Sequence, residues 1–168
     1  TEGQNGNVTV TAGNTCGTST ASTLAVTVAA GTPTQPGSIT GTAAQCPSLT
    51  NQSYSIAAVS GATTYTWTVP TGWTITGGQG TTNINLTTGS AGQNGNITVT
   101  AGNTCGTSTA RTLSVTVFDA FTSGEISSIG ETICSGGTPS IIGSTTSASG
   151  GDGNITYSWR SSVDNFVS

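Results

Sequence analysis

Residues 92–117 read GQNGNITVTAGNTCGTSTARTLSVTV, and residues 3–28 read GQNGNVTVTAGNTCGTSTASTLAVTV. The two copies lie 89 positions apart and differ at three pairs of positions: Val8/Ile97, Ser22/Arg111 and Ala25/Ser114. A step of this size is typical of one β-sandwich domain and exceeds the unit of a solenoid. The sequence therefore predicts a tandem array of recently duplicated domains, with further copies flanking this stretch.

The repeat divides the chain into three parts. We expect residues 1–30 to be the C-terminal part of a preceding repeat, 37–118 a complete repeat, and 125–168 the N-terminal part of a following, variant repeat. The run Thr32-Pro33-Thr34-Gln35-Pro36 separates the first two parts, because its prolines remove backbone donors and favour an extended linker. The partial third repeat is expected to lean on its neighbours or to be poorly ordered.

The apolar residues of the complete repeat alternate with threonine, serine and asparagine, which is the pattern of half-buried strands. The inward-facing sets are Tyr54, Ile56 and Ala58; Tyr65, Trp67 and Val69; Ile84 and Leu86; Ile97, Val99 and Ala101; and Leu113, Val115 and Val117. Glycine-rich breaks separate these sets at 60–62, 77–80 and 89–95. The sequence predicts an all-β fold of tandem immunoglobulin-like antiparallel β-sandwiches.

Composition excludes several classes of function. The 168 residues include 2 Lys+Arg, 6 Asp+Glu and no His, and 5% are charged. Without His there is no Ser-His-Asp machinery or imidazole metal site, and two cations make no nucleic-acid or anionic-lipid surface. Residues 37–118 contain no Asp or Glu, so we expect no acid–base enzyme and no cofactor. No apolar run is long enough for membrane insertion. The sequence does not decide whether calcium binds at the domain junction near Asp119 and Glu125.

The four cysteines predict a structural disulfide. Cys46 and Cys105 are the one pair in the complete repeat, and we expect them to form a disulfide that joins the loop regions at one end of the sandwich. Closing this loop would stabilise the domain by about 4 kcal/mol in the chain-entropy model. Cys16 and Cys134 would then be half-pairs whose partners lie outside the chain. Free buried thiols are the alternative. A disulfide would place the protein in an oxidising compartment, secreted or at the cell surface.

The aromatic residues are expected to fill the core. Trp67 and Tyr65 belong to one inward-facing set, and Trp159 occupies the corresponding position in the third part. Trp73 has two interpretations: it caps the core, or it is an exposed platform on which a sugar ring stacks.

Several motifs carry a family resemblance. Cys46-Pro47-Ser48, the run Tyr65-Thr66-Trp67-Thr68-Val69-Pro70, and Asn103-Thr104-Cys105-Gly106 resemble PKD-like repeats of Bacteroidota surface proteins. The stretches Ile133-Cys134-Ser135-Gly136-Gly137 and Tyr157-Ser158-Trp159 resemble repeats of giant gliding-motility adhesins of the SprB type. The Trp-Asp-Phe-Gly-Asp-Gly signature of typical PKD domains is absent, because Thr68-Val69-Pro70 follows Trp67.

The resemblance implies stalk repeats of a very large adhesin filament, exported by the type IX secretion system and displayed at the cell surface for gliding and attachment. Its partners would be neighbouring repeats, the secretion and motility machinery, and surfaces such as substratum polysaccharide. The alternative function is a carbohydrate-binding or accessory module of a secreted polysaccharide-degrading enzyme, which would use an exposed Trp73.

Overall fold

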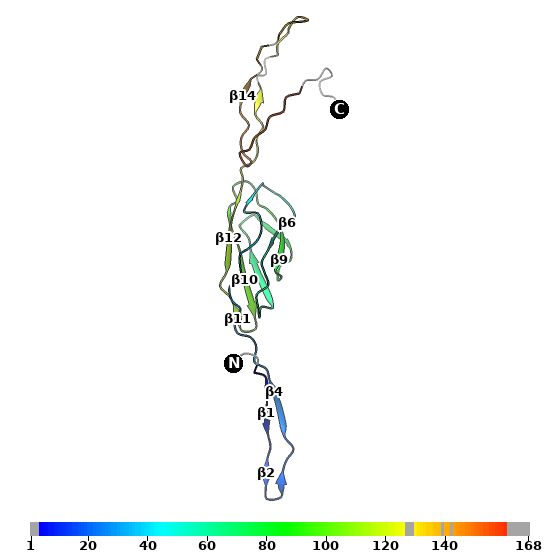
Figure 1. Ribbon diagram of the computed structural model, residues 1–168, viewed down its shortest axis with the longest axis vertical. Helices are drawn as coiled ribbons and strands as arrows, with labels where there is room; N and C mark the ends of the chain where they lie inside the picture. The colour runs from blue at the N-terminus through cyan, green and yellow to red at the C-terminus, as the bar shows by residue number, and fades with distance from the viewer. Residues whose placement is uncertain (1–3, 127–129, 139, 142, 161–168) are drawn as a thin grey trace.

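The computed structural model describes residues 4–126, 130–138, 140–141 and 143–160, and every regular element in them is a β-strand. None of these residues forms a helix long and apolar enough to cross a membrane. Figure 1 shows a slender molecule in which a two-stranded ribbon, a central sandwich and a hairpin segment follow one another along the long axis. The chain passes through these three sections in order.

The first sheet of the central sandwich is built around its longest strand, β10. Strands β7 and β12 flank β10 as antiparallel neighbours, β11 pairs with its C-terminal end, and β5 lies parallel to β12. The bounds are β5 (Ala44–Gln45), β7 (Thr64–Thr68), β10 (Gly95–Asn103), β11 (Gly106–Thr107) and β12 (Arg111–Val117). Threonines cover the outer face, and the hydroxyls of Thr68 and Thr98 lie 2.6 Å apart across β7 and β10.

The second sheet is smaller and has the order β6–β9–β8, all antiparallel. Its strands are β6 (Gln52–Ser55), β8 (Thr74–Gly77) and β9 (Asn83–Thr87). An isolated antiparallel bridge between Thr40 and Ser55 adds a short edge beside β6. The prediction of an all-β, immunoglobulin-like sandwich is confirmed.

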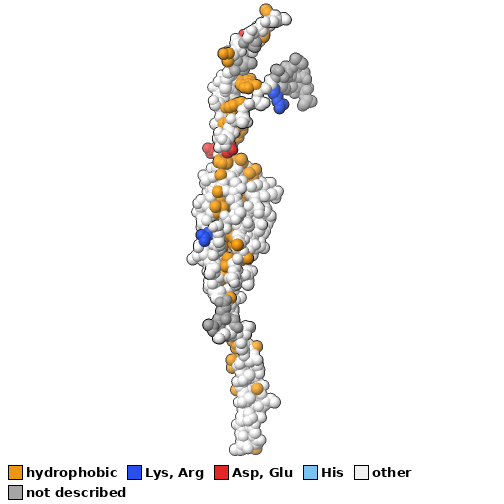
Figure 2. Space-filling model, viewed as in Figure 1, with side chains coloured by type: hydrophobic (Ala, Val, Ile, Leu, Met, Phe, Trp, Pro, Cys, Tyr) orange, Lys and Arg blue, Asp and Glu red, His pale blue; other side chains and the backbone are white. Residues whose placement is uncertain are grey.

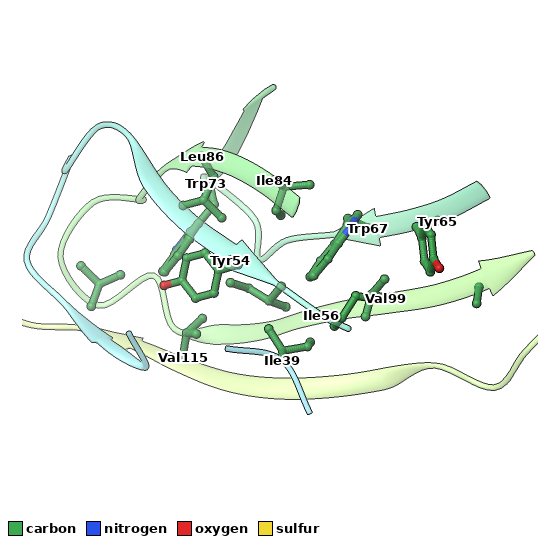
Figure 3. Close-up of a cluster of buried hydrophobic side chains, with 13 residues drawn as sticks. Ile39, Tyr54, Ile56, Tyr65, Trp67, Trp73, Ile84, Leu86, Val99 and Val115 are labelled. Atoms are coloured by element: carbon green, nitrogen blue, oxygen red, sulfur yellow. The ribbon is translucent and has the colours of Figure 1, made fainter. Parts of the chain in front are cut away.

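The hydrophobic core lies between these two sheets (Figure 3). It consists of Ile39, Tyr54, Ile56, Tyr65, Trp67, Trp73, Ile84, Leu86, Ile97, Val99, Ala101, Val115 and Val117. The predicted inward-facing sets supply most of these residues. Ala58 is an exception and is exposed, because it lies in the loop after β6, beyond Ile56, the last buried member of its set.

The N-terminal section reproduces part of the sandwich without its cover. Strands β1 (Gly6–Val10) and β4 (Ser22–Val26) pair in the register that β10 and β12 use, and β2 (Gly13–Asn14) and β3 (Gly17–Thr18) repeat the β10–β11 turn. Val8 is 62% exposed, whereas its counterpart Ile97 is 0% exposed. The ribbon thus forms from its own sequence, while burial requires a second sheet. Its assignment to a preceding repeat stays a prediction.

The C-terminal section is a hairpin of β13 (Glu125–Ile126) and β14 (Ser144–Thr146), extended by a bridge between Thr122 and Ser149. The large apolar side chains of Ile141, Tyr157 and Trp159 are exposed. Its assignment to a following repeat also remains a prediction.

Candidate functional site

The first and last strands of the central sandwich lie side by side and run in the same direction. Strand β5 pairs with the end of β12, so that Ala44 faces Thr116 and Gln45 faces Val117. The Thr116 N–H donates to the Ala43 carbonyl at 2.8 Å, and the Phe118 N–H donates to the Gln45 carbonyl at 2.9 Å. Tension applied to the two ends of this domain would pull the two strands past each other, so these bonds share the load.

A buried phenol braces strand β5 from beneath. The Tyr54 hydroxyl donates to the Thr42 carbonyl at 2.6 Å and accepts from Gln45 Nε2 at 3.0 Å. Gln45 is one of two buried polar side chains among the described residues. Burial raises the pKa of Tyr54, and the hydrogen bond from Gln45 offsets part of the rise. The phenol therefore stays protonated and keeps donating to Thr42.

The linker that enters the sandwich is docked on the β10–β11 turn. Asn103 Nδ2 donates to the Gly31 carbonyl at 2.7 Å, and the Thr32 hydroxyl donates to the Cys105 carbonyl at 3.3 Å. Arg111 Nε donates to the Pro36 carbonyl at 2.9 Å. These contacts tie the connection between repeats to the end of the domain that faces the β1–β4 ribbon (Figure 1).

The disulfide expected between Cys46 and Cys105 is not formed. All four cysteines, Cys16, Cys46, Cys105 and Cys134, belong to the described residues and are exposed free thiols. Cys46 follows β5, level with the start of β10, whereas Cys105 lies in the turn after the end of β10. The nine residues of β10 put roughly 25 Å between these two ends, whereas the Cα atoms of a disulfide lie about 4.4–6.8 Å apart. The expectation erred in placing both loops at one end.

Trp67 and Tyr65 lie in the core, as expected. Trp67 is 2% exposed, and its indole Nε1 donates to the Thr81 carbonyl at 2.8 Å. The Gln79 side chain bridges the Trp67 main chain, accepting from its N–H at 3.0 Å and donating to its carbonyl at 2.9 Å. The Tyr65 hydroxyl accepts from the Val59 N–H at 2.8 Å. Each buried polar atom in this region therefore has a partner.

Trp73 caps the core and does not present a stacking platform. Its side chain is 6% exposed, and its indole Nε1 donates to the Gln93 carbonyl at 2.8 Å. Figure 3 shows the ring between Leu86 and Tyr54 in the core cluster. The expectation of a glycan contact at Trp73 is therefore corrected, because both faces of the indole are taken up by protein.

Trp159, which the sequence assigns to a core, is 61% exposed. In the central sandwich the β6–β9–β8 sheet packs on the face of the sheet that carries Trp67, and no second sheet covers Trp159 in the part of the chain that the structure describes. With Tyr157, Trp159 lines an open hollow against Glu125 and Ile126.

No chemical centre is found in the described residues. They contain no cluster of three His, Cys, Asp or Glu side chains that could hold a metal ion. Figure 2 shows a surface of mostly uncharged polar atoms with few charged side chains. The features that the geometry does show are a closed core, two parallel terminal strands (β5 and β12) and a linker that is hydrogen-bonded to the sandwich.

The terminal strand pair and the docked linker are not indicated by any pattern in the sequence. Strand β5 has two residues, which is too short for an alternation of apolar and polar residues to predict it. The burial of Gln45 could not be predicted from its residue type either, since glutamine is mostly found at the surface. The loop Asn103-Thr104-Cys105-Gly106 was noted as a motif, but its contact with Gly31 depends on the fold.

Comparison with known proteins identifies the family. A family model of the PKD-like domain matches residues 32–115, which begin in the docked linker and end within β12. No curated protein and no solved structure matches the chain. The matched range covers half of the 168 residues and contains the whole second sheet and nearly all of the first. The chain therefore belongs to the PKD-like domain family.

Proposed function

We propose that this protein is a piece of the stalk of a large surface adhesin, in which each repeat is a load-bearing spacer. The observation that carries the proposal is the parallel pairing of β5 with β12. The linker enters at the β10–β11 turn, and the chain leaves at the opposite end of the domain, after β12. Tension along the array therefore pulls β5 and β12 in opposite directions and loads the hydrogen bonds from the Thr116 and Phe118 N–H groups together. An antiparallel terminal pair would instead open one bond at a time.

Three further features support a spacer. The copies at residues 3–28 and 92–117 differ at three positions, whereas modules that bind specific ligands usually diversify their contact loops. The linker is fixed to the sandwich by Asn103 and Arg111. The burial of Trp73 removes the aromatic platform on which the alternative carbohydrate-binding function depended.

The location and biological setting belong to the same proposal. PKD-like domains often occur in extracellular proteins, and we infer that this one is secreted and displayed at the cell surface. The resemblance of Cys134–Gly137 and Tyr157–Trp159 to repeats of Bacteroidota gliding adhesins supports export by the type IX system and a role in gliding and attachment. Neighbouring repeats and the motility machinery would be its partners.

Single-molecule force spectroscopy tests the mechanical role. We compare the chain with a lengthened chain in which residues 1–117 are joined to residues 29–168, so that the complete repeat occurs twice. Because Val28 corresponds to Val117, this junction reproduces the natural one. Pulling on the ends should give one unfolding event for the chain and two equal events for the lengthened chain, each releasing up to about 27 nm.

Two variants of one residue test whether the strand pair carries the load. Phe118→Pro deletes the N–H that donates to Gln45, whereas Phe118→Ala keeps that N–H and removes only the side chain. We expect Phe118→Pro to unfold at a lower force than Phe118→Ala. Equal forces for the two variants, or unfolding of the parent chain without a distinct force peak, would contradict the load-bearing role.

A further inference from the structure

The four cysteines fall into two structural classes. Cys105 and Cys16 occupy equivalent turns, β10–β11 and β2–β3, and we call them loop cysteines. Cys46 follows β5, and Cys134 lies 88 positions later, which is close to the 89-residue step of the repeat. We therefore group these two by sequence position and call them strand cysteines. Each class thus occurs in two of the three sections, and all four thiols are exposed.

The two classes lie at opposite ends of the repeat. Cys46 is adjacent to Gln45, whose carbonyl accepts from the Phe118 N–H, so the strand cysteine stands where the chain leaves the domain. Cys105 contacts Thr32 through its carbonyl, so the loop cysteine stands where the linker enters the domain. In a tandem array, the strand cysteine of one repeat therefore faces the loop cysteine of the next.

The linker between repeats gives the spacing of this pair. Position 29 of the linker corresponds to Phe118, so in a preceding repeat it lies beside the residue equivalent to Gln45, next to the strand cysteine. Thr32 holds the loop cysteine three residues further on. Three residues span at most about 11 Å. Both cysteines are thus held against the same short linker, whereas about 25 Å separates Cys46 from Cys105 of its own repeat.

We propose that consecutive repeats are joined by disulfides between the strand cysteine of one repeat and the loop cysteine of the next. The Cα atoms of a disulfide lie about 4.4–6.8 Å apart, so bond formation needs a small bend at the linker. The linker residues Ala29, Ala30 and Gly31 are small, and a Cβ on Gly31 would meet nothing within 4 Å. The inference rests on the proposed tandem stalk and adds a covalent joint to it.

The chemistry is ordinary thiol–disulfide exchange. One thiolate attacks the disulfide of an oxidant, either oxidised glutathione or a dithiol oxidoreductase, and forms a mixed disulfide while one oxidant thiol leaves. The second cysteine then displaces the other oxidant thiol and closes the S–S bond between the repeats. Two protons and two electrons leave the cysteines, and the oxidant gains them as two thiols.

The lengthened chain, residues 1–117 joined to 29–168, contains the junction needed for the test. Three variants each keep two cysteines and replace the other four by serine. The junction variant keeps Cys46 of the first copy and Cys105 of the second. The same-copy variant keeps Cys46 and Cys105 of the first copy. The reciprocal variant keeps Cys105 of the first copy and Cys46 of the second.

Each variant is incubated in a glutathione redox buffer and followed by thiol titration and non-reducing electrophoresis. The junction variant should lose both thiols as a monomer at a rate independent of protein concentration. The other two should form an intramolecular bond at least about tenfold more slowly. The fluorescence of the buried Trp67 and Trp73 verifies that all three are folded.

Three outcomes would each contradict the proposed disulfide between repeats. These are equal rates for all three variants, oxidation of the junction variant only to dimers between molecules, and faster closure of the same-copy variant. Failure of the joint and failure of the stalk are distinguishable, because the two equal unfolding events are measured with all cysteines reduced. If the two unfolding events are present and the junction variant stays reduced, the proposed spacer function is supported and the proposed disulfide between repeats is wrong.

Discussion

Replacing Tyr54 by Phe tests whether the buried phenol holds strand β5 in place. The substitution keeps the ring in the core and removes one oxygen. That oxygen donates to the Thr42 carbonyl at 2.6 Å and accepts from Gln45 Nε2 at 3.0 Å. Gln45 keeps a longer contact of 3.3 Å to the same carbonyl. One strong bond is therefore lost outright, and the buried Gln45 amide loses an acceptor.

The two bonds set the expected magnitude. A buried hydrogen bond contributes about 0.5–1.5 kcal/mol, and a buried group left without its partner costs about 1–3 kcal/mol. Because the Thr42 carbonyl retains the Gln45 contact, we expect Tyr54→Phe to lower the free energy of unfolding by about 1–2 kcal/mol. For a domain of this size the melting temperature should fall by roughly 5–15 °C.

The assay is thermal and urea unfolding followed by fluorescence of the buried tryptophans. Tyr157→Phe is the matched control, because Tyr157 is 59% exposed and the same atom is removed there. The control should change stability by less than about 0.5 kcal/mol. A Tyr54→Phe variant as stable as the Tyr157→Phe variant would refute the brace beneath β5.

Three further substitutions or conditions test the core and its polar contacts. Gly41→Ala would place a Cβ 2.1 Å from Cδ1 of the buried Tyr54 ring, so it should lower the free energy of unfolding in urea by about 1–3 kcal/mol. In the control Gly37→Ala the Cβ meets nothing within 4 Å, and stability should be nearly unchanged. Equal effects of the two substitutions would contradict the predicted clash with Tyr54. Because burial raises the pKa of Tyr54, its stabilising contribution is full below the unfolded pKa of about 10 and is lost as pH rises through the folded value. Urea unfolding at several alkaline pH values should show this loss in the parent protein and a smaller loss in Tyr54→Phe. Gln79→Ala leaves the Trp67 main-chain groups without the side-chain bonds of 3.0 and 2.9 Å and should lower stability by about 1–2 kcal/mol, an effect absent if water replaces the amide.

The alternation of apolar and polar residues was enough to predict the strands and most of the core. Ile97, Val99 and Val115 are buried as their spacing indicated, because a period of two places such residues on one face of a strand. The near-copy at residues 3–28 folds into the same ribbon in the same register, which local sequence alone determines.

What the sequence could not reveal depends on the ends of strands and on distant partners. The pairing of Cys46 with Cys105 failed because one cysteine per loop does not say at which end of the sandwich each loop lies. The exposure of Trp159 has a similar origin, since its residue pattern matches that of Trp67, whereas burial requires a second sheet, which the described residues do not supply there. The β5–β12 pair joins residues more than seventy positions apart, and no local pattern encodes it.

The β5–β12 pair also sets the order in which the domain can complete its folding. A polypeptide that becomes available from its N-terminus presents β5 and the β6–β9–β8 sheet first, while the residues that complete the opposite sheet arrive last. The N–H groups of Thr116 and Phe118 donate to the carbonyls of Ala43 and Gln45. The hydrogen bonds between β5 and β12 can therefore form only after β12 has become available. Until then the Ala43 and Gln45 carbonyls lack these donors, and strands β5 and β12 cannot bear tension together.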